Sequence, residues 1–269
     1  MIVPRATNSV LAVPPPPASS LGIISPHLDD AVLSCGRLLA MHPSADVVTV
    51  FSGGPERVDP LPWWDQMCEV FEPGDDVTAV RRGEDLGALA VAGARAHHLG
   101  FWDEQYRAGP PALGRLGRLW PGAVRRRPPG DADGELEARV KASIRHSVEE
   151  IGAPTWLIPL GLHRGDHELV ARACLDLVGS RPDVRWVVYE ELPYGAECPE
   201  KAGVALEHLG SAGFVLGAAE LEVDPGTAKK AHMVRSHRSQ MAALGHRVDM
   251  AIEGDEVYHL ISSRRLAAP

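Results

Sequence analysis

Two short polar stretches of this chain hold the side-chain types that hydrolytic metal sites use. The residues are His27, Asp29 and Asp30 in the first stretch and His163, Asp166 and His167 in the second. Imidazoles and carboxylates are zinc ligands, and a catalytic zinc site takes three protein ligands and leaves a position for water. If the two stretches converge, they supply three ligands, a base and an acid, which is the equipment for amide hydrolysis.

Each stretch also has a plainer interpretation at the start of a helix. Asp29 or Asp30 suits a helix N-terminus as a cap and as a partner of the helix dipole. His167 would then be an unliganded residue at a helix start, and His163 an exposed loop residue. A cap needs one Asp, however, and explains neither the second Asp nor His27. We therefore favour the chemical interpretation.

The surrounding pattern indicates how the two stretches are positioned. The first follows an apolar strand at 21–24 and precedes a helix at 31–41; the second follows a strand at 155–160 and precedes a helix at 169–178. Ligands bind at the carboxyl ends of the strands in open α/β sheets. Further strands are predicted at 46–51, 96–101, 185–189, 214–223 and 257–261, and further helices at 77–92, 135–151 and 225–244.

This alternation predicts an α/β fold with a mostly parallel sheet and helices on both faces. The helix over 77–92 is predicted from apolar Val80, Leu86, Leu89 and Ala90, which are spaced among charged residues. We expect residues 1–20, with their run of prolines, to form an N-terminal tail and residues 21–269 to form a single domain.

Composition excludes several classes of partner. The net charge of −9 and the pI of about 5.7 argue against a nucleic-acid partner. No apolar run approaches the roughly 20 residues of a membrane span, so we expect no membrane partner. The N-terminus lacks a basic segment followed by a continuous apolar core, so no secretory signal is expected. The 4 cysteines are scattered, which favours free thiols and a cytoplasmic location.

Several motifs together resemble one enzyme family. Residues 26–31 (PHLDDA) resemble the P/A-H-x-D-D-E/A motif of the LmbE-like, or PIG-L, zinc-dependent de-N-acetylases, which remove acyl groups from N-acylated amino sugars. Residues 81–85 are similar to the family's R-R-x-E-D helix, 189–194 to its Y-x-D-L-P-Y segment, and Lys230 with 237–240 to its K…H-x-S-Q helix. The resemblance spans nearly all of the chain after the tail and implies a three-layer, Rossmann-like fold.

The resemblance also implies roles for individual residues and one zinc ion as the cofactor. His27, Asp30 and His167 would be the metal ligands, Asp29 the general base on the water that the metal binds, Asp166 the residue that orients a neighbouring imidazole, and His163 the electrostatic or general-acid residue. In the family's second motif the first and last histidines are three positions apart, whereas His163 and His167 are four positions apart. Arg82 and Asp103 resemble positions that touch the sugar.

Other candidates keep two interpretations. Trp63 and Trp64 are either core residues or a wall against which the substrate packs. His237 either contacts the substrate or is a packed or surface residue of its helix. Arg82 either contacts the sugar or pairs with a nearby acid such as Glu84 or Asp85.

The predicted function is zinc-dependent hydrolysis of the N-acyl amide of a small-molecule amino-sugar conjugate. High Ala, Gly, Pro and Arg content suggests a GC-rich source, which within the resemblance favours an antibiotic or other secondary-metabolite intermediate. The alternatives are a metal-dependent amidase acting on a thiol or peptide conjugate, and an inactive sugar-binding module. A zincin is disfavoured because Arg164 stands where the H-E-x-x-H motif requires Glu.

Overall fold

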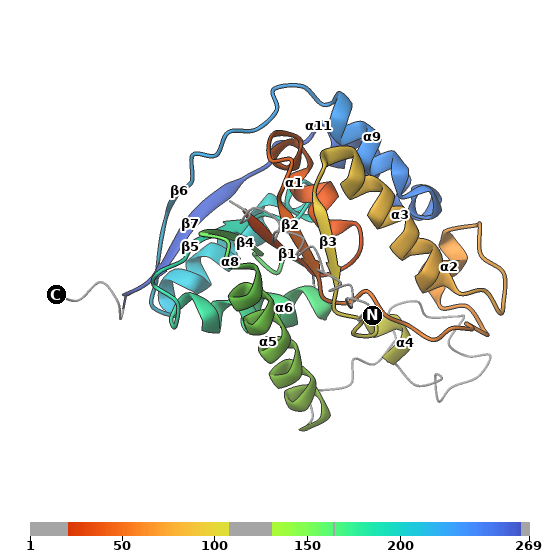
Figure 1. Cartoon of the computed structure of the whole chain (residues 1–269), viewed down its shortest axis with the longest axis horizontal. Coiled ribbons are helices and arrows are strands. Elements are labelled where there is room, and N and C mark those ends of the chain that lie inside the picture. The colour runs from red at the N-terminus through yellow and green to blue at the C-terminus, as the bar shows by residue number, and fades with distance from the viewer. Residues whose placement is uncertain (1–20, 108–130, 164, 265–269) are drawn as a thin grey trace, which may run out of the picture.

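The computed structural model of the chain describes residues 21–107, 131–163 and 165–264, with side chains from Gly134 onward in the middle segment. The predicted tail, residues 1–20, lies outside the described residues. Figure 1 shows a sheet with helices packed around it. None of the described helices has the length and apolar composition needed to cross a bilayer.

The centre of the fold is a 7-stranded sheet in the order β3-β2-β1-β4-β5-β7-β6. Its strands are β1 (Gly22–Ser25), β2 (Asp46–Thr49), β3 (Arg95–His98), β4 (Thr155–Pro159), β5 (Arg185–Tyr189), β6 (Phe214–Ala218) and β7 (Tyr258–Ser263). Strands β1 to β5 pair in parallel, and β7 is antiparallel to both β5 and β6. The predicted mostly parallel α/β sheet is therefore confirmed.

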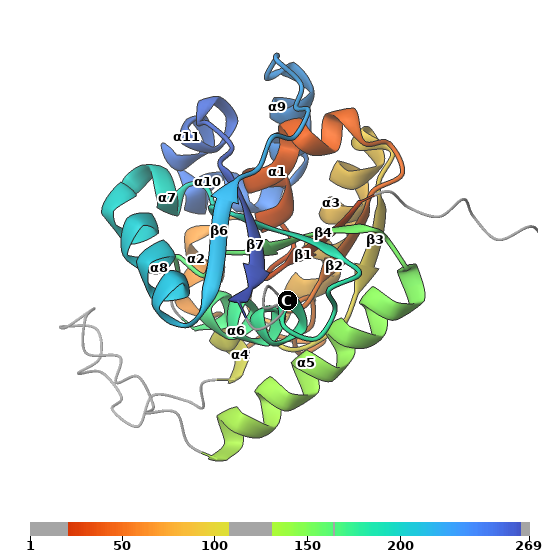
Figure 2. The ribbon, with the colours of Figure 1, turned by 90° about the vertical axis from the view of Figure 1, so that its left-hand side faces the viewer.

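Helices cover both faces of this sheet, as predicted (Figure 2). The longer helices are α1 (Asp30–Met41), α3 (Val77–Ala92), α5 (Asp131–Ile151), α6 (Asp166–Val178), α8 (Pro199–Ser211), α9 (Ala228–Ser236) and α11 (Arg247–Glu253). Helices α1, α3, α9 and α11 share one buried cluster with Ile23 of β1, whereas α5, α6 and α8 share the other with Ile24. Successive strand residues point to opposite faces, so the apolar strand fills both cores.

Shorter elements complete the fold near the carboxyl ends of the strands. They are α2 (Trp63–Met67), α4 (Glu104–Arg107), α7 (Tyr194–Glu197), the 3₁₀ turn η2 (Arg238–Gln240) and α10 (Met241–Leu244). Strand order reverses between β1 and β4, because the chain leaves β1 toward β2 and β3 and later continues from β4 toward β5. Such a switch point is where open α/β sheets bind ligands, and both polar stretches follow the two strands that flank it.

Two sequence expectations about helices need correction. The helix predicted over 225–244 ends at Ser236, since His237 has non-helical dihedral angles and the carboxylate of Glu84 accepts hydrogen bonds from the backbone and hydroxyl of Ser239. In α3, Val80 and Leu86 are 47% and 53% exposed, because the buried side of this helix carries Arg81 and Asp85 together with apolar residues such as the predicted Leu89.

Candidate metal centre

The turn after β1 is shaped by Ser25. Its hydroxyl donates to the carbonyl of His27 at 2.6 Å and accepts from the backbone N–H of Ala31 at 3.0 Å. The backbone N–H of His27 donates to the Asp30 carboxylate at 2.8 Å. Asp29 occupies the N-cap position of α1, but its side chain makes no capping hydrogen bond. Capping therefore does not explain Asp29.

The turn after β4 is held by a carboxylate from the segment that follows β5. The buried Glu191 accepts hydrogen bonds from the backbone N–H groups of Gly161 at 2.9 Å and Leu162 at 3.1 Å. Gly165 has a φ of 74°, in the left-handed region, and a Cβ at this position would collide with the carboxylate of Glu104. Only glycine fits this turn without strain.

The two turns bring three candidate ligands together. The Asp30 carboxylate lies 3.2 Å from Nδ1 of His27 and 3.6 Å from Nε2 of His167. One ligand atom from each of these residues lies within 4.8 Å of the others, so the three could hold one metal ion. The second ring nitrogen of His167 lies 3.3 Å from Glu191, and a carboxylate on the far side of an imidazole fixes its orientation and tautomer.

A second group of acids lies on the other side of the His27 ring. Its Nε2 is 3.2 Å from Asp166 and 3.9 Å from Asp103, so these three also form a possible cation site. Asp166 is fully buried, and it accepts hydrogen bonds from the guanidinium of Arg107 and, at 2.9 Å, from the backbone N–H of Glu104. Asp166 thus contacts the imidazole of His27 in this structure.

These contacts determine the charge state of the cluster. Burial alone would lower the pKa of His27, but Asp103, Asp166 and Asp30 outweigh burial and raise that pKa well above its usual value. Burial likewise would lower the pKa of His167, but Asp30 and Glu191 raise it. For Asp30, burial would raise the pKa, but the two histidines hold it well below its usual range. The free cluster therefore favours imidazolium cations beside an ionised carboxylate.

An arginine connects the two groups of acids. The buried guanidinium of Arg81 lies 3.6 Å from Asp29 and 3.6 Å from Asp103. Burial alone would lower the pKa of Arg81, but these carboxylates raise it further above its usual value. Arg81 is therefore a permanent cation that holds Asp29 and Asp103 beside the candidate ligands.

Comparison with known proteins agrees with this geometry. Residues 23–178 match the family described as PIG-L, GlcNAc-PI de-N-acetylase. The chain belongs to this family. The match includes both polar turns and Arg81, and it confirms the LmbE-like resemblance found in the sequence.

Relatives of the chain include deacetylases of antibiotic biosynthesis. The 2'-N-acetylparomamine deacetylase of Streptomyces fradiae is 30% identical over 182 residues, which cover 65% of this chain and 57% of that protein. The chain thus matches less than two thirds of that relative's length. A crystal structure of a deacetylase of the teicoplanin biosynthesis pathway is 27% identical, with a TM-score of 0.69 over 90% of this chain and 98% of that chain.

Another solved structure, the zinc-inhibited form of teicoplanin deacetylase, is 25% identical with a TM-score of 0.70 and the same coverage.

The remaining predicted residues lie in different environments. His163 stacks on Tyr194 at 4.6 Å between ring centroids and lies 5.3 Å from the ring of His167, so the longer second motif still keeps it beside the cluster. Asp103 joins the cluster through Arg81 and His27. Arg82 is half-buried on α3 and makes no salt bridge with any residue in the described ranges.

The aromatic candidates Trp63, Trp64 and His237 also differ in their burial. Trp64 packs inside and donates its indole N–H to Gln240 at 2.8 Å, in agreement with a core role. Trp63 is 70% exposed. His237 is buried at the end of α9, and its electrostatic partner is Asp85 of α3. The substrate roles of Trp63, Trp64, Arg82 and His237 stay predictions.

Sequence reasoning missed three residues of this centre. Glu191 was noted only as part of a motif, yet its position after a buried strand placed it at the same sheet edge. The sequence motif that contains Arg81 suggested a substrate role for the adjacent Arg82 and none for Arg81. No sequence signal marked Arg107, which reaches Asp166 from the short helix α4.

Proposed function

We propose that this chain is a metal-dependent deacetylase that hydrolyses the N-acyl amide of an amino-sugar conjugate. The observation that carries the proposal is the convergence of His27, Asp30 and His167, with Asp29 held beside them by Arg81 instead of capping its helix. Family membership supports the same reaction class.

The residues present fit a divalent metal ion. Four carboxylates, those of Asp29, Asp30, Asp103 and Asp166, outnumber the guanidinium groups of Arg81 and Arg107, so the centre offers net negative charge to a cation. Two imidazoles and one carboxylate form a ligand set typical of catalytic zinc, so zinc is the ion that we propose. A zinc ion bound there would polarise the amide carbonyl and lower the pKa of a water molecule.

The side chains of the chain would carry the proton transfers and bind the sugar. Asp29, free of any capping bond, takes a proton from the attacking water as the general base. His163, oriented by its stacking on Tyr194, stabilises the developing oxyanion or donates a proton to the leaving amine. Arg81 and Asp103, which already touch each other, present a donor and an acceptor to sugar hydroxyls.

The relatives support an antibiotic or other secondary-metabolite intermediate as the substrate. One relative is named a 2'-N-acetylparomamine deacetylase, and another is a deacetylase in the biosynthesis pathway of teicoplanin. We extend this class of substrate to this chain. We also propose a cytoplasmic location, because Cys35, Cys68, Cys174 and Cys198 are all free.

The test combines metal content with turnover. The purified chain, reconstituted with zinc, should bind about one ion per chain and release a primary amine from N-acetylglucosaminides. Asp29→Asn should keep the zinc and lose roughly 1,000-fold in kcat. A fully active Asp29→Asn would contradict the assigned base.

Other outcomes identify the alternatives. Zinc binding with release of an amine only from peptide or thiol conjugates would indicate a different amidase. Sugar binding without zinc or turnover would indicate an inactive module.

A further inference from the structure

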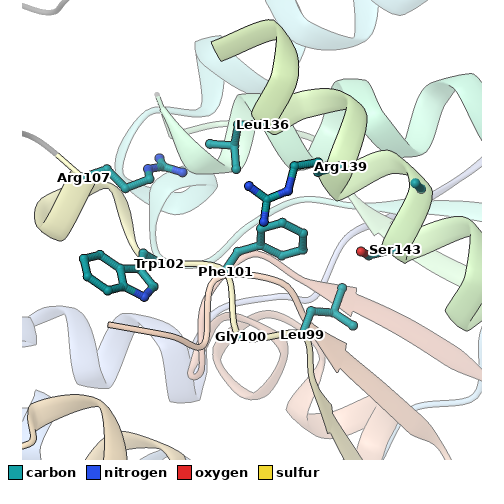
Figure 3. Close-up of a pocket in the computed structure, with 9 residues that line it drawn as sticks. Leu99, Gly100, Phe101, Trp102, Arg107, Leu136, Arg139 and Ser143 are labelled. Carbon is teal, nitrogen blue, oxygen red and sulfur yellow. The ribbon is translucent and has the colours of Figure 1, made fainter. Parts of the chain in front are cut away.

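A cavity of about 710 Å³ lies between the segment that joins β3 to α4 and one side of α5 (Figure 3). Leu99, Phe101 and Trp102 form one wall, and Leu136 forms the opposite wall. Its volume is within the range of small-molecule sites, and its lining combines apolar side chains with the guanidinium groups of Arg107 and Arg139 and the hydroxyl of Ser143.

This cavity adjoins the candidate metal centre. Arg107 lines it and also donates to the buried carboxylate of Asp166, so one side chain belongs to both places. The guanidinium of Arg107 lies 4.8 Å from the ring centroid of Phe51, which in turn packs edge-on against Phe101 at 6.3 Å. Trp102 directly precedes Asp103 in the chain. The cavity and the centre therefore share Arg107 and adjacent residues of one segment.

The cavity carries positive charge in an acidic protein. The charge of Arg107 is offset by Asp166, but Arg139 is exposed and forms no salt bridge with the described part of the chain. Its guanidinium lies 5.6 Å above the ring centroid of Phe101, and this packing holds it over the apolar wall (Figure 3). A guanidinium held in this way is suited to bind a carboxylate through two hydrogen bonds.

We infer that the cavity binds an apolar or aromatic group of the substrate that carries a carboxylate, and that Arg139 determines this preference. The inference rests on the proposed function and names the part of the conjugate on the far side of the sugar from the amide. A cationic group would meet the guanidinium of Arg139 there, whose charge no acid in the described ranges offsets. A neutral acyl chain would bury the apolar walls but leave Arg139 without a partner.

A matched series of substrates tests the inference. The probes are the phenyl, 4-carboxyphenyl and 4-(aminomethyl)phenyl N-acetylglucosaminides, assayed with the full-length, zinc-loaded protein. We expect kcat/KM to be about tenfold higher for the carboxyphenyl than for the phenyl compound, equivalent to about 1.4 kcal/mol, and lowest for the aminomethyl compound.

Arg139→Gln should remove the preference for the acid, so that kcat/KM for the carboxyphenyl compound falls about tenfold, to the level of the phenyl compound. Arg145→Gln, on the same helix but away from the cavity, should behave as the wild type. Equal rates for the acidic and neutral compounds in the wild type, or a preference that survives Arg139→Gln, would overturn the inference.

A binding measurement separates this inference from the proposed function. If none of the compounds is hydrolysed, calorimetry with the amide-free 4-carboxyphenyl glucosaminide still reports on the cavity. About tenfold tighter binding to the wild type than to Arg139→Gln would then support the cavity although the proposed reaction had failed. Equal binding to both proteins would overturn the inference.

Discussion

Replacement of Arg81 by glutamine should damage both the fold and the reaction. The guanidinium is buried between Asp29 and Asp103, at 3.6 Å from each. Without it, two nearly buried carboxylates face each other and the other acids of the centre without a permanent cation. The adjacent Arg82→Gln provides a matched control, because Arg82 is half-buried and forms no salt bridge in the described ranges.

The separation of the groups sets the size of the effect. In an effective dielectric of about 20, each pair at this distance attracts by about 4–5 kcal/mol. The cost of burying the guanidinium offsets part of this attraction, and breaking buried pairs costs about 3–5 kcal/mol in practice. Since the contacts are longer than hydrogen bonds, we expect the free energy of unfolding to fall by about 3 kcal/mol, or Tm by about 6–12 °C.

Urea unfolding of the zinc-free and zinc-loaded proteins measures the first effect, and amine release from an N-acetylglucosaminide measures the second. We expect kcat/KM to fall about 100-fold. Adding Asp103→Asn to Arg81→Gln should recover about 1–2 kcal/mol, because it removes one unpaired charge. Equal stability of Arg81→Gln and wild type, or an equal loss of stability in Arg82→Gln, would refute this account of the site.

Three further predictions concern the metal, the packing and pH. His167→Ala should weaken zinc binding at least about 100-fold in a chelator competition, and unchanged affinity would exclude it as a ligand. Gly22→Ala should cost about 1–3 kcal/mol, because its Cβ would lie 2.6 Å from the Trp156 ring, whereas Gly203→Ala on exposed α8 should be neutral or stabilising. Burial raises the pKa of Asp65 despite the hydrogen bond from Tyr106. The stability of the wild type relative to Asp65→Asn should therefore be greatest below the unfolded pKa of about 3.8 and fall as pH rises through the raised folded pKa. Urea unfolding of both proteins at about pH 4 and about pH 7 measures this change. A stability of the wild type relative to Asp65→Asn that increases with pH would contradict the prediction.

The sheet and the placement of the two polar turns could be predicted from the sequence, because each turn follows an apolar strand and precedes a helix. Which side of α3 is buried could not be predicted from the sequence. Its buried side carries Arg81 and Asp85, which pair with carboxylates and with His98 at the sheet edge, while Val80 and Leu86 face outward. A hydrophobic pattern cannot reveal a helix face whose burial depends on charges supplied by other elements.

The residues that contact the centre from distant parts of the chain could not be predicted from the sequence either. Glu191 contacts His167 from the segment that follows β5, and Arg107 reaches Asp166 across 59 positions of the chain. The left-handed conformation of Gly165 in the second motif also had no signal in the spacing of the histidines. Such contacts depend on how elements that are distant in the sequence pack at the switch point, so no local spacing of residues predicts them.

The sharing of Arg107 between the candidate metal centre and the cavity limits how the proposed substrate preference of this chain can change. A substitution of Arg107 would alter the environment of Asp166 and His27 together with the cavity wall, so a gain for a new substrate would come with a change in the rate of the reaction itself. Arg139 and Trp102 line the same cavity without touching the candidate ligands. Divergence toward new conjugates should therefore proceed through these two positions, while Arg107 stays fixed.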